Sequence, residues 1–276
     1  MNPTSEKIAV ITGATSGLGL ETAKAVAQAG WRIGFVARNR DRGEAARNIV
    51  FRETGSDRLD LWICDLSSPD QIRRLAGEIR SAYPRLNVLV NNAAVVPAVR
   101  TMTADGLETQ FAVNHLAYFL LTNLLLDPLR AAAPSRVVNV SSGLHERAAL
   151  DFENLQGEKS YKPMTQYGAM KLANVLFTYE LARRLEGSGV TAVALSPGFT
   201  ATGLGRNFSP GMRWAMKVLG KRADQGAAGI VRLALSPEVE GMTGRYFRGL
   251  KEVRSSRASL DPETARRLWE LSARLT

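Results

Sequence analysis

KIAVITGATSGLG, from Lys7 to Gly19, is the stretch that decides the fold of this chain. Its first six residues form a short apolar and β-branched run, which is typical of a buried parallel strand. The glycine-rich turn that follows lets the backbone approach a pyrophosphate group. The alanine-rich helix behind it, which Gly30 can end, offers free N–H groups at its N-terminus. The alternative is a tight strand-to-helix turn without a ligand. The stretch predicts an anion-binding turn made by Gly13, Thr15, Ser16, Gly17, Leu18 and Gly19.

Further apolar runs repeat this arrangement of strand and helix along the chain. We expect strands at residues 32–37, 59–64, 88–90, 136–140 and 190–195, and a short one near Tyr246. Helices fill the intervals, with long ones at 103–130 and 161–187 and a last one that Asp261 caps. Strands that alternate with helices imply a parallel sheet covered on both faces. We therefore expect an α/β fold with a Rossmann-type, doubly wound parallel sheet in a single domain, residues 1–276.

Several predicted strands end in residues suited to a dinucleotide. Arg38 follows the second strand, where an acidic residue would bind free ribose hydroxyls and an arginine pairs better with a 2′-phosphate. Arg38 therefore favours NADP(H), with NAD(H) as the second option, unless it is only an exposed arginine that starts the next helix. Asp65 and Leu66 follow the third strand, where a carboxylate could meet an adenine amino group. Asn92 and Ala93 follow the fourth strand, where small residues would let a cofactor lie against the backbone.

A tyrosine and a lysine lie four residues apart in YGAMK, Tyr167 to Lys171. That spacing places them on one face of a helix, one turn apart. A phenol ordinarily has a pKa of about 10, and a nearby ammonium group favours its ionised form. The pair could thus donate or accept a proton near neutral pH, as carbonyl–alcohol interconversion requires. The same spacing also occurs on ordinary solvated helix faces, so its meaning depends on the neighbouring motifs.

The composition narrows the classes of function. Lys and Arg number 36 against 26 Asp and Glu, a net charge of +10, but no nucleic-acid-binding motif accompanies this charge. An anionic cofactor or an anionic membrane surface accounts for the charge as well. Cys64 is the single cysteine and excludes an internal disulfide. The sequence has no apolar run long enough to span a bilayer and no signal-peptide core, so we expect a cytoplasmic protein with, at most, peripheral membrane contact.

Five motifs occur in one order: TGATSGLG, NNAA, FAVNH around Asn114, VVNVS ahead of Ser142, and YGAMK ahead of a later SPG. In this combination the chain resembles the short-chain dehydrogenase/reductase family, classical type, over nearly its whole length. The long interval between Ser142 and Tyr167, and the residues KLANVLF that begin at Lys171, resemble its retinol-dehydrogenase-like branch more closely.

This resemblance implies a catalytic tetrad of Asn114, Ser142, Tyr167 and Lys171. Tyr167 would be the general acid and base, and Ser142, rather than its neighbour Ser141, would hold the substrate oxygen. Lys171 would bind the nicotinamide ribose and lower the pKa of the tyrosine, and Asn114 would position a water in a proton relay. Cofactor contacts are implied for Tyr167, Lys171, Pro197, Gly198 and Thr200.

Apolar residues in two parts of the chain predict the class of substrate and the association of copies of the chain. Residues 198–222 form a long irregular stretch near the predicted site, and its apolar side chains are expected to cover an apolar carbonyl or alcohol substrate. Retinoids, steroids, terpenoids and simple aldehydes or ketones fit, although we expect no N-terminal anchor like that of membrane-bound retinol dehydrogenases. An ordinary amphipathic helix is the alternative for that stretch. The family implies a homodimer or homotetramer through the two long helices, whose apolar residues include Phe119, Leu120, Leu124, Leu125, Leu176, Phe177 and Tyr179.

Two other classes of function fit parts of the sequence. A catalytically silent dinucleotide-binding regulatory or scaffold protein would keep the glycine-rich turn, but the intact Asn, Ser, Tyr and Lys set argues against it. A nucleic-acid binder would use the positive charge but lacks a motif. We therefore expect an oxidoreductase that moves hydride between a nicotinamide and a small-molecule carbonyl or alcohol, with no metal ligands and no nucleic-acid partner.

Overall fold

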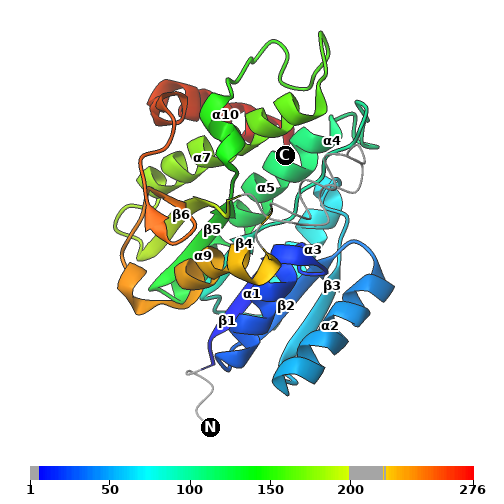
Figure 1. Cartoon of the computed structure of the whole chain (residues 1–276), viewed down its shortest axis with the longest axis vertical. Helices are drawn as coiled ribbons and strands as arrows, with labels where there is room; N and C mark the ends of the chain where they lie inside the picture. Colours follow the sequence, from blue (N-terminus) through cyan, green and yellow to red (C-terminus); the bar gives the residue numbers. More distant parts are fainter. Residues whose placement is uncertain (1–5, 199–219, 221) are drawn as a thin grey trace.

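The structure is a computed structural model that describes residues 6–198, 220 and 222–276 (Figure 1). In this part of the chain eight strands form one sheet in the order β3-β2-β1-β4-β5-β6-β7-β8. All neighbouring strands are parallel except β7 and β8. The strands are β1 (Ile8–Thr12), β2 (Arg32–Ala37), β3 (Leu59–Ile63), β4 (Val88–Asn91), β5 (Ser135–Val140), β6 (Val190–Ser196), β7 (Arg245–Arg248) and β8 (Lys251–Glu252).

Helices connect the strands and cover both faces of the sheet. The α-helices are α1 (Gly17–Gln28), α2 (Arg40–Thr54), α3 (Pro69–Ala82), α4 (Thr109–Phe111), α5 (Ala117–Leu124), α6 (Leu126–Ala131), α7 (Pro163–Arg184), α9 (Ala223–Leu235) and α10 (Pro262–Leu275). A π-helical turn η1 (Ala112–Leu116) joins α4 to α5, and short 3₁₀ turns are η2 (Gly143–Arg147), η4 (Pro237–Val239) and η5 (Arg257–Leu260). The predicted α/β, doubly wound, mostly parallel sheet is confirmed.

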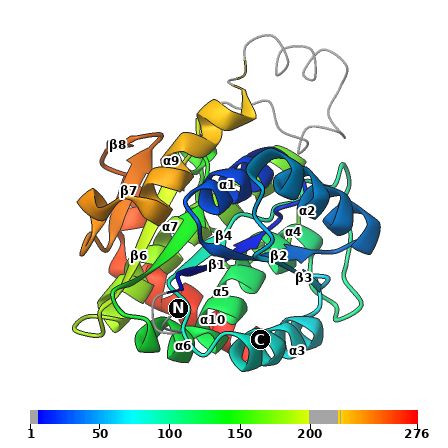
Figure 2. The same cartoon turned by 90° about the horizontal axis from the view of Figure 1, so that it is seen from below.

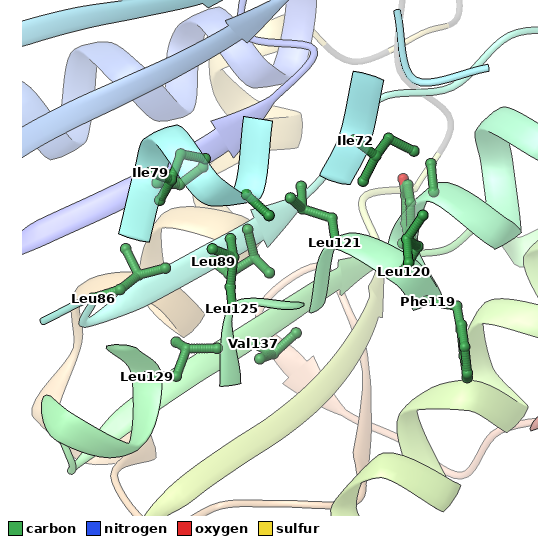
Figure 3. Close-up of a cluster of buried hydrophobic side chains, with 14 of the residues drawn as sticks. Ile72, Ile79, Leu86, Leu89, Phe119, Leu120, Leu121, Leu125, Leu129 and Val137 are labelled. Carbon is green, nitrogen blue, oxygen red and sulfur yellow. The ribbon is translucent and has the colours of Figure 1, made fainter. Parts of the chain in front are cut away.

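Alternate residues of each strand point to opposite faces of the sheet, as they must in a strand buried on both sides. Leu89 and Val137 pack with Ile79 of α3 and Leu121 of α5 on one face (Figure 3). The neighbouring residues of the same strands, such as Val90, pack against α1 and α9 on the other face. Figure 2 shows α1, α2 and α9 on one side of the sheet and α3 and α10 on the other. The continuous apolar runs in the sequence therefore reflect burial on both faces.

The order of the strands reverses between β1 and β4, because β1 pairs with β2 on one side and with β4 on the other. Ligands of open α/β sheets bind in the crevice at the carboxyl ends of the strands at such a reversal. Gly13 follows β1, Asn92 follows β4, and Ser142 follows β5, which is the next strand along. The fold thus gathers three of the predicted site segments at one edge of the sheet.

The predicted helix at 103–130 is wrong in its first part and is interrupted in its middle. The carboxylate of Glu108 accepts hydrogen bonds from the backbone N–H groups of Gln110 (2.8 Å) and Phe111 (2.9 Å), so the helix begins only at Thr109. Glu108 is fully buried and also accepts from Nε2 of Gln166 in α7 (3.0 Å). The cap therefore depends on a residue far along the chain. The second long helix is shorter than predicted, because it starts at Pro163 and ends at Arg184.

Helix α10 lies across α7 and covers the surface that the sequence assigned to an oligomer interface. The Trp269 ring stacks on Phe177 with centroids 5.7 Å apart and meets Phe119 edge-on at 4.9 Å. Phe119, Leu120, Leu125, Leu176 and Phe177 are buried within the chain, and Leu124 and Tyr179 are half-buried. Most of the apolar surface on the two helices is thus buried inside one molecule, so it gives little support to an interface there.

A homodimer or homotetramer through another face stays a prediction. Light scattering at micromolar concentration measures the mass of the particle. A mass of 30.0 kDa, that of one chain, would contradict self-association.

Candidate active site

The glycine-rich turn after β1 has the backbone that the sequence predicts. Gly13 and Gly17 adopt positive φ angles of 67° and 54°, a region that favours glycine. A Cβ atom on Gly19 would lie 2.4 Å from the carbonyl oxygen of Gly13, so this position also requires glycine. Ser16 precedes α1 in an extended conformation, and its side chain does not cap the helix. The first N–H groups of α1 therefore lack a side-chain cap, and a pyrophosphate fits there.

The ends of β1 and β4 are joined by a pair of side chains at the base of this turn. The Thr12 hydroxyl accepts hydrogen bonds from the backbone N–H groups of Asn92 (2.9 Å) and Ala93 (3.1 Å). The Asn92 amide in turn donates to the carbonyls of Thr12 (2.9 Å) and Gly13 (3.3 Å). Asn92 and Ala93 thus lie beside the turn, and Asn92 has a structural task there. Sequence reasoning missed Thr12, because a strand-end threonine looks like any other β-branched strand residue.

Arg38 is exposed at the end of β2, whose Val36 carbonyl accepts from the N–H of Gly13 (3.2 Å). The end of β2 is therefore bonded to the glycine-rich turn, and Arg38 follows it at the strand end where the cofactor's ribose is expected. Asn39 caps α2 by accepting from the N–H of Arg42 (2.9 Å), so the helix starts after Arg38 rather than at it.

Asp65 follows β3 and has local partners. Its carboxylate accepts from the N–H (2.9 Å) and the hydroxyl (2.8 Å) of Ser67, and its own N–H donates to Oε1 of Gln71 (2.9 Å). Leu66, the next residue, is buried. These contacts fix the strand-to-helix turn, and the carboxylate stays half-buried at the same edge of the sheet as the glycine-rich turn.

Tyr167 and Lys171 lie one turn apart on α7, and both are buried, with 8% and 1% of their surface exposed. The Lys171 ammonium donates to the Val140 carbonyl at the end of β5 (2.8 Å) and to the hydroxyl of Tyr118 (3.5 Å). It lies 5.5 Å from the centre of the Tyr167 ring. The pair is therefore not on a solvated helix face, which was the alternative interpretation of its spacing.

Burial shifts the pKa values of both residues toward their neutral forms. It lowers the pKa of Lys171 to about 7 and raises that of Tyr167. In the chain by itself the pKa of Tyr167 is thus raised, not lowered as the spacing predicted, because burial disfavours the phenolate. The same burial makes Lys171 responsive near neutral pH, where its charge can change with what binds beside it.

The two serines after β5 have different surroundings. Ser141 is buried and its hydroxyl donates to the backbone carbonyl of Lys171 (2.8 Å). Ser142 is half-buried, and its hydroxyl oxygen accepts from the N–H of Leu144 (3.3 Å). A Cβ atom on Gly168, next to Tyr167, would lie only 3.3 Å from the carbonyl of Leu144, so η2 and α7 are in close contact. Ser142 therefore lies on a segment held against the tyrosine helix, and Ser141 helps to hold it.

Asn114 lies in the π-helical turn η1 and is fully buried. Its amide pairs with the backbone of Val95, accepting from the N–H (2.8 Å) and donating to the carbonyl (2.9 Å). It also donates to the side chain of Gln110 (3.3 Å). Such π-helical turns occur frequently at functional sites. The Val95 carbonyl is thus the hydrogen-bond partner that this buried asparagine needs. The water that Asn114 would position in a proton relay stays a prediction.

Tyr118 is a site residue that sequence reasoning missed. It follows Asn114 by one turn, and its hydroxyl donates to the Ala93 carbonyl (3.0 Å) and lies 3.5 Å from the Lys171 ammonium. Burial raises its pKa well above the ordinary value, so it remains a neutral partner for the lysine. The helical spacing from Asn114 was the signal that could have identified it. His115, predicted to be structural, is buried and bonds through Nε2 to the Ser272 hydroxyl of α10 (2.9 Å).

The end of β6 is the last predicted part of the site. Pro197 is buried, and Gly198 is exposed with a φ angle of 85°, its N–H donating to the Ser196 hydroxyl (3.3 Å). Thr200 and nearly all of the predicted lid, residues 198–222, lie outside the described residues.

Known proteins share both the sequence and the fold of this chain. The family profile described as short chain dehydrogenase matches residues 7–213. Retinol dehydrogenase 14 of Mus musculus is 42% identical over 282 residues, which cover 96% of this chain and 84% of that protein. Retinol dehydrogenase 11 of Homo sapiens is 41% identical over 271 residues, which cover 98% and 85%.

Solved structures of related proteins have the same fold as this chain. An uncharacterised protein from Mycobacterium paratuberculosis superposes with a TM-score of 0.79 at 32% identity, over 98% of this chain and 92% of that one. A short chain dehydrogenase from Burkholderia cenocepacia, in complex with NADP, shares the fold with a TM-score of 0.71 at 24% identity, over 88% of this chain and 95% of that one. This chain is therefore an oxidoreductase that belongs to the short chain dehydrogenase family, in its retinol-dehydrogenase-like branch.

Proposed function

We propose that this protein is an NADP(H)-dependent oxidoreductase that transfers hydride between the nicotinamide and the carbonyl or alcohol group of an apolar substrate. The observation that carries the proposal is the buried pair Tyr167 and Lys171, held against the segment that bears Ser142. This pair lies at the sheet edge that also carries the glycine-rich turn. A nicotinamide-dependent carbonyl reductase needs a proton donor and a site for the dinucleotide close to each other. The strand-order reversal offers a place for both.

Each residue has one task in this proposal. Tyr167 gives its hydroxyl proton to the substrate oxygen in reduction and takes it back in oxidation, while the Ser142 hydroxyl holds that oxygen in place. Lys171 holds the nicotinamide ribose and supplies positive charge near the phenol. Asn114 orders the backbone of Val95 beside the cofactor segment 92–95. The bound nicotinamide supplies or accepts the hydride.

The contacts proposed for the cofactor follow the edge of the sheet. The N–H groups from Gly13 to Gly19 would hold the pyrophosphate, and Arg38 would pair with the 2′-phosphate. Asp65 and Leu66 would border the adenine, and Asn92 and Ala93 the adjoining ribose. Beyond them, the contacts proposed near the nicotinamide come from Tyr167, Lys171, Pro197, Gly198 and Thr200.

Arg38→Asp is expected to reverse the choice of cofactor. The substitution replaces a phosphate partner by a like charge, so the Kd of NADPH should rise by about tenfold to a hundredfold, whereas that of NADH should stay equal or fall. Isothermal titration with both nucleotides measures the two constants. Arg42→Asp, an equal change of charge at an exposed position on α2, is the matched control and should change neither. An unaltered preference in Arg38→Asp would show that the 2′-phosphate is recognised elsewhere.

The apolar character of the substrate is supported by the surface next to the catalytic residues. Leu144 and Met164 are large apolar side chains that are each 41% exposed. Leu144 follows Ser142 by two residues, and Met164 precedes Tyr167 by three, one turn before Gly168 on the same helix. The named relatives are retinol dehydrogenases, whose substrate class is also long and apolar. A retinoid, steroid, terpenoid or apolar aldehyde therefore fits better than a sugar.

Met164→Asp is expected to raise KM for a long aldehyde such as decanal or retinaldehyde by about tenfold, and to leave KM for a small ketone and the Kd of NADPH unchanged. Steady-state kinetics with both substrates measure this difference. Phe51→Asp, at an exposed apolar position on α2, is the control. Equal losses for the long and the small substrate would remove Met164 from the substrate surface.

Incubation of the protein with NADPH or NADH and a panel of aldehydes and ketones, followed through the absorbance of the reduced nicotinamide, tests the proposed reaction. Cytoplasmic location and peripheral membrane contact remain predictions. Among the helices of residues 6–198 and 222–276, none is both long and apolar enough to cross a membrane.

A further inference from the structure

His145 links the segment of Ser142 to the C-terminal part of the chain. It lies in η2, three residues after Ser142, and it is fully buried. Its Nδ1 is 2.8 Å from the Ser142 carbonyl oxygen, and its Nε2 is 3.3 Å from the backbone nitrogen of Ser256. The imidazole therefore touches the backbone of the serine proposed to hold the substrate, and it touches a loop more than a hundred residues away.

These two contacts select one form of the imidazole. A carbonyl oxygen can only accept, so Nδ1 must carry a hydrogen, and a backbone N–H can only donate, so Nε2 must carry a lone pair. The neutral Nδ1–H tautomer satisfies both partners, whereas the other tautomer and the imidazolium each lose at least one. Burial, which lowers the pKa of His145, favours the same neutral form.

The loop on the far side of His145 is attached to the catalytic helix. Ser256 adjoins Ser255, whose hydroxyl is 2.6 Å from the hydroxyl of Tyr179 on α7. The Ser259 hydroxyl donates to the Ser256 carbonyl (2.7 Å) and lies 2.7 Å from the Ser255 hydroxyl, so the loop is ordered by its own hydrogen bonds. A continuous chain of hydrogen bonds thus runs from Ser142 through His145 to the helix that carries Tyr167.

We propose that His145 is a positioning residue for the oxidoreductase reaction, which fixes the Ser142 segment relative to α7 by bridging the Ser142 carbonyl and the Ser256 N–H. This inference rests on the proposed function, because the bridge matters only if Ser142 and Tyr167 act on the same substrate oxygen. The bridge would then fix the distance between these two residues. Reactions of positioned groups are sensitive to such distances, and a misplacement of about 1 Å can cost about a hundredfold in rate.

His145→Phe is the first test. The ring can still pack against Tyr246, whose centroid is 4.7 Å from that of His145, but both hydrogen bonds are lost. We expect kcat to fall by about tenfold to a hundredfold, with the Kd of NADPH unchanged. His145→Asn, whose amide N–H can reach the Ser142 carbonyl, should recover part of the loss. Arg248→Gln breaks the neighbouring ion pair with Glu146 (2.5 Å) without touching the imidazole, and kcat should stay within about twofold.

Ser256 offers a second test that leaves His145 intact. Ser256 has φ −62° and ψ 153°, which proline can adopt, so Ser256→Pro removes the N–H donor without forcing this residue into a new conformation. Ser256→Ala keeps the N–H and loses only the hydroxyl that accepts from the Ser259 N–H (3.4 Å). A fall in kcat in the proline variant alone supports the bridge. Equal kcat values in the two variants would overturn it, even if His145→Phe failed to fold.

The tautomer gives a readout that does not depend on activity. The chain has two histidines, so ¹⁵N chemical shifts of labelled imidazoles can be assigned with a His145→Asn sample. We expect the neutral Nδ1–H form for His145 at neutral pH, and an Nε2–H tautomer or an imidazolium would contradict the bridge. The charged or titratable groups that face the ring are Glu146, on the same turn, and Arg248 and Tyr246 on β7.

An inactive parent protein would refute the proposed function, whereas an active parent with an unaffected His145→Phe variant would refute only this inference.

Discussion

Tyr167→Phe is expected to lower kcat by about 10²–10⁴-fold and to leave the Kd of NADPH nearly unchanged. The substitution removes one oxygen and no other atom. The ring is buried on α7 beside Lys171, so phenylalanine fits the same space. Because burial raises the pKa of Tyr167, the parent residue carries its proton at neutral pH in the chain alone.

Steady-state kinetics with NADPH and an apolar aldehyde measure the loss, and fluorescence titration measures nucleotide binding. Tyr161→Phe is the matched control, because Tyr161 also bears a hydroxyl that makes hydrogen bonds, to Gln110 (2.9 Å) and Pro97 (3.3 Å), but it is not on α7. A kcat within a few-fold of the parent value in Tyr167→Phe would remove this tyrosine from the mechanism.

Lys171→Met is expected to abolish most of the activity and to stabilise the protein at neutral pH. The pKa of Lys171 is about 7 in the folded chain against an ordinary value of 10.5, owing to burial. Between these pH values the unfolded chain binds a proton that the folded chain does not, so the free energy of unfolding of the parent rises as the pH increases from 7 to 10.5. A shift of this size corresponds to several kcal/mol. The Val140 carbonyl loses its donor in the variant, at a cost of about 1–3 kcal/mol, which is the smaller effect.

Thermal unfolding of the nucleotide-free protein at several pH values tests the predicted gain in stability. The melting temperature of Lys171→Met should exceed that of the parent most at pH 7 and below, and the difference should shrink toward pH 10. We expect kcat to fall by about 10²–10⁴-fold, as for the loss of an acid–base group. A variant that is less stable than the parent at pH 7 would show that the lysine is paired rather than strained in the folded chain.

Local sequence patterns predicted the strands and the glycine-rich turn well. The β1 strand and the turn up to Gly19 depend on residues next to one another, so the apolar run, the glycines and the helix behind them carried the information. Arg38 and Ser142 were also located by strand ends, which a doubly wound sheet brings to one edge.

Three differences between the predictions and the structure depend on contacts between distant residues. The start of α4 depends on the buried Glu108, which is itself bonded to Gln166. The covering of α7 by α10 depends on Trp269, and without it the apolar faces of the two helices looked like an interface. The direction of the Tyr167 pKa shift depends on burial, which the spacing from Lys171 could not reveal. A local sequence pattern thus does not predict which residues of the site become buried by distant parts of the chain.

Oxidation of NADPH by retinaldehyde, decanal and a set of smaller carbonyls, measured in parallel for the parent and Tyr167→Phe, tests both the proposed reaction and the role of Tyr167. We expect turnover by the parent that is fastest with the apolar aldehydes and is lost in the variant, while both proteins bind NADPH with equal Kd. Tight binding of NADPH without turnover of any carbonyl, or of any alcohol with NADP⁺, would contradict the proposed reaction and favour a silent dinucleotide-binding protein.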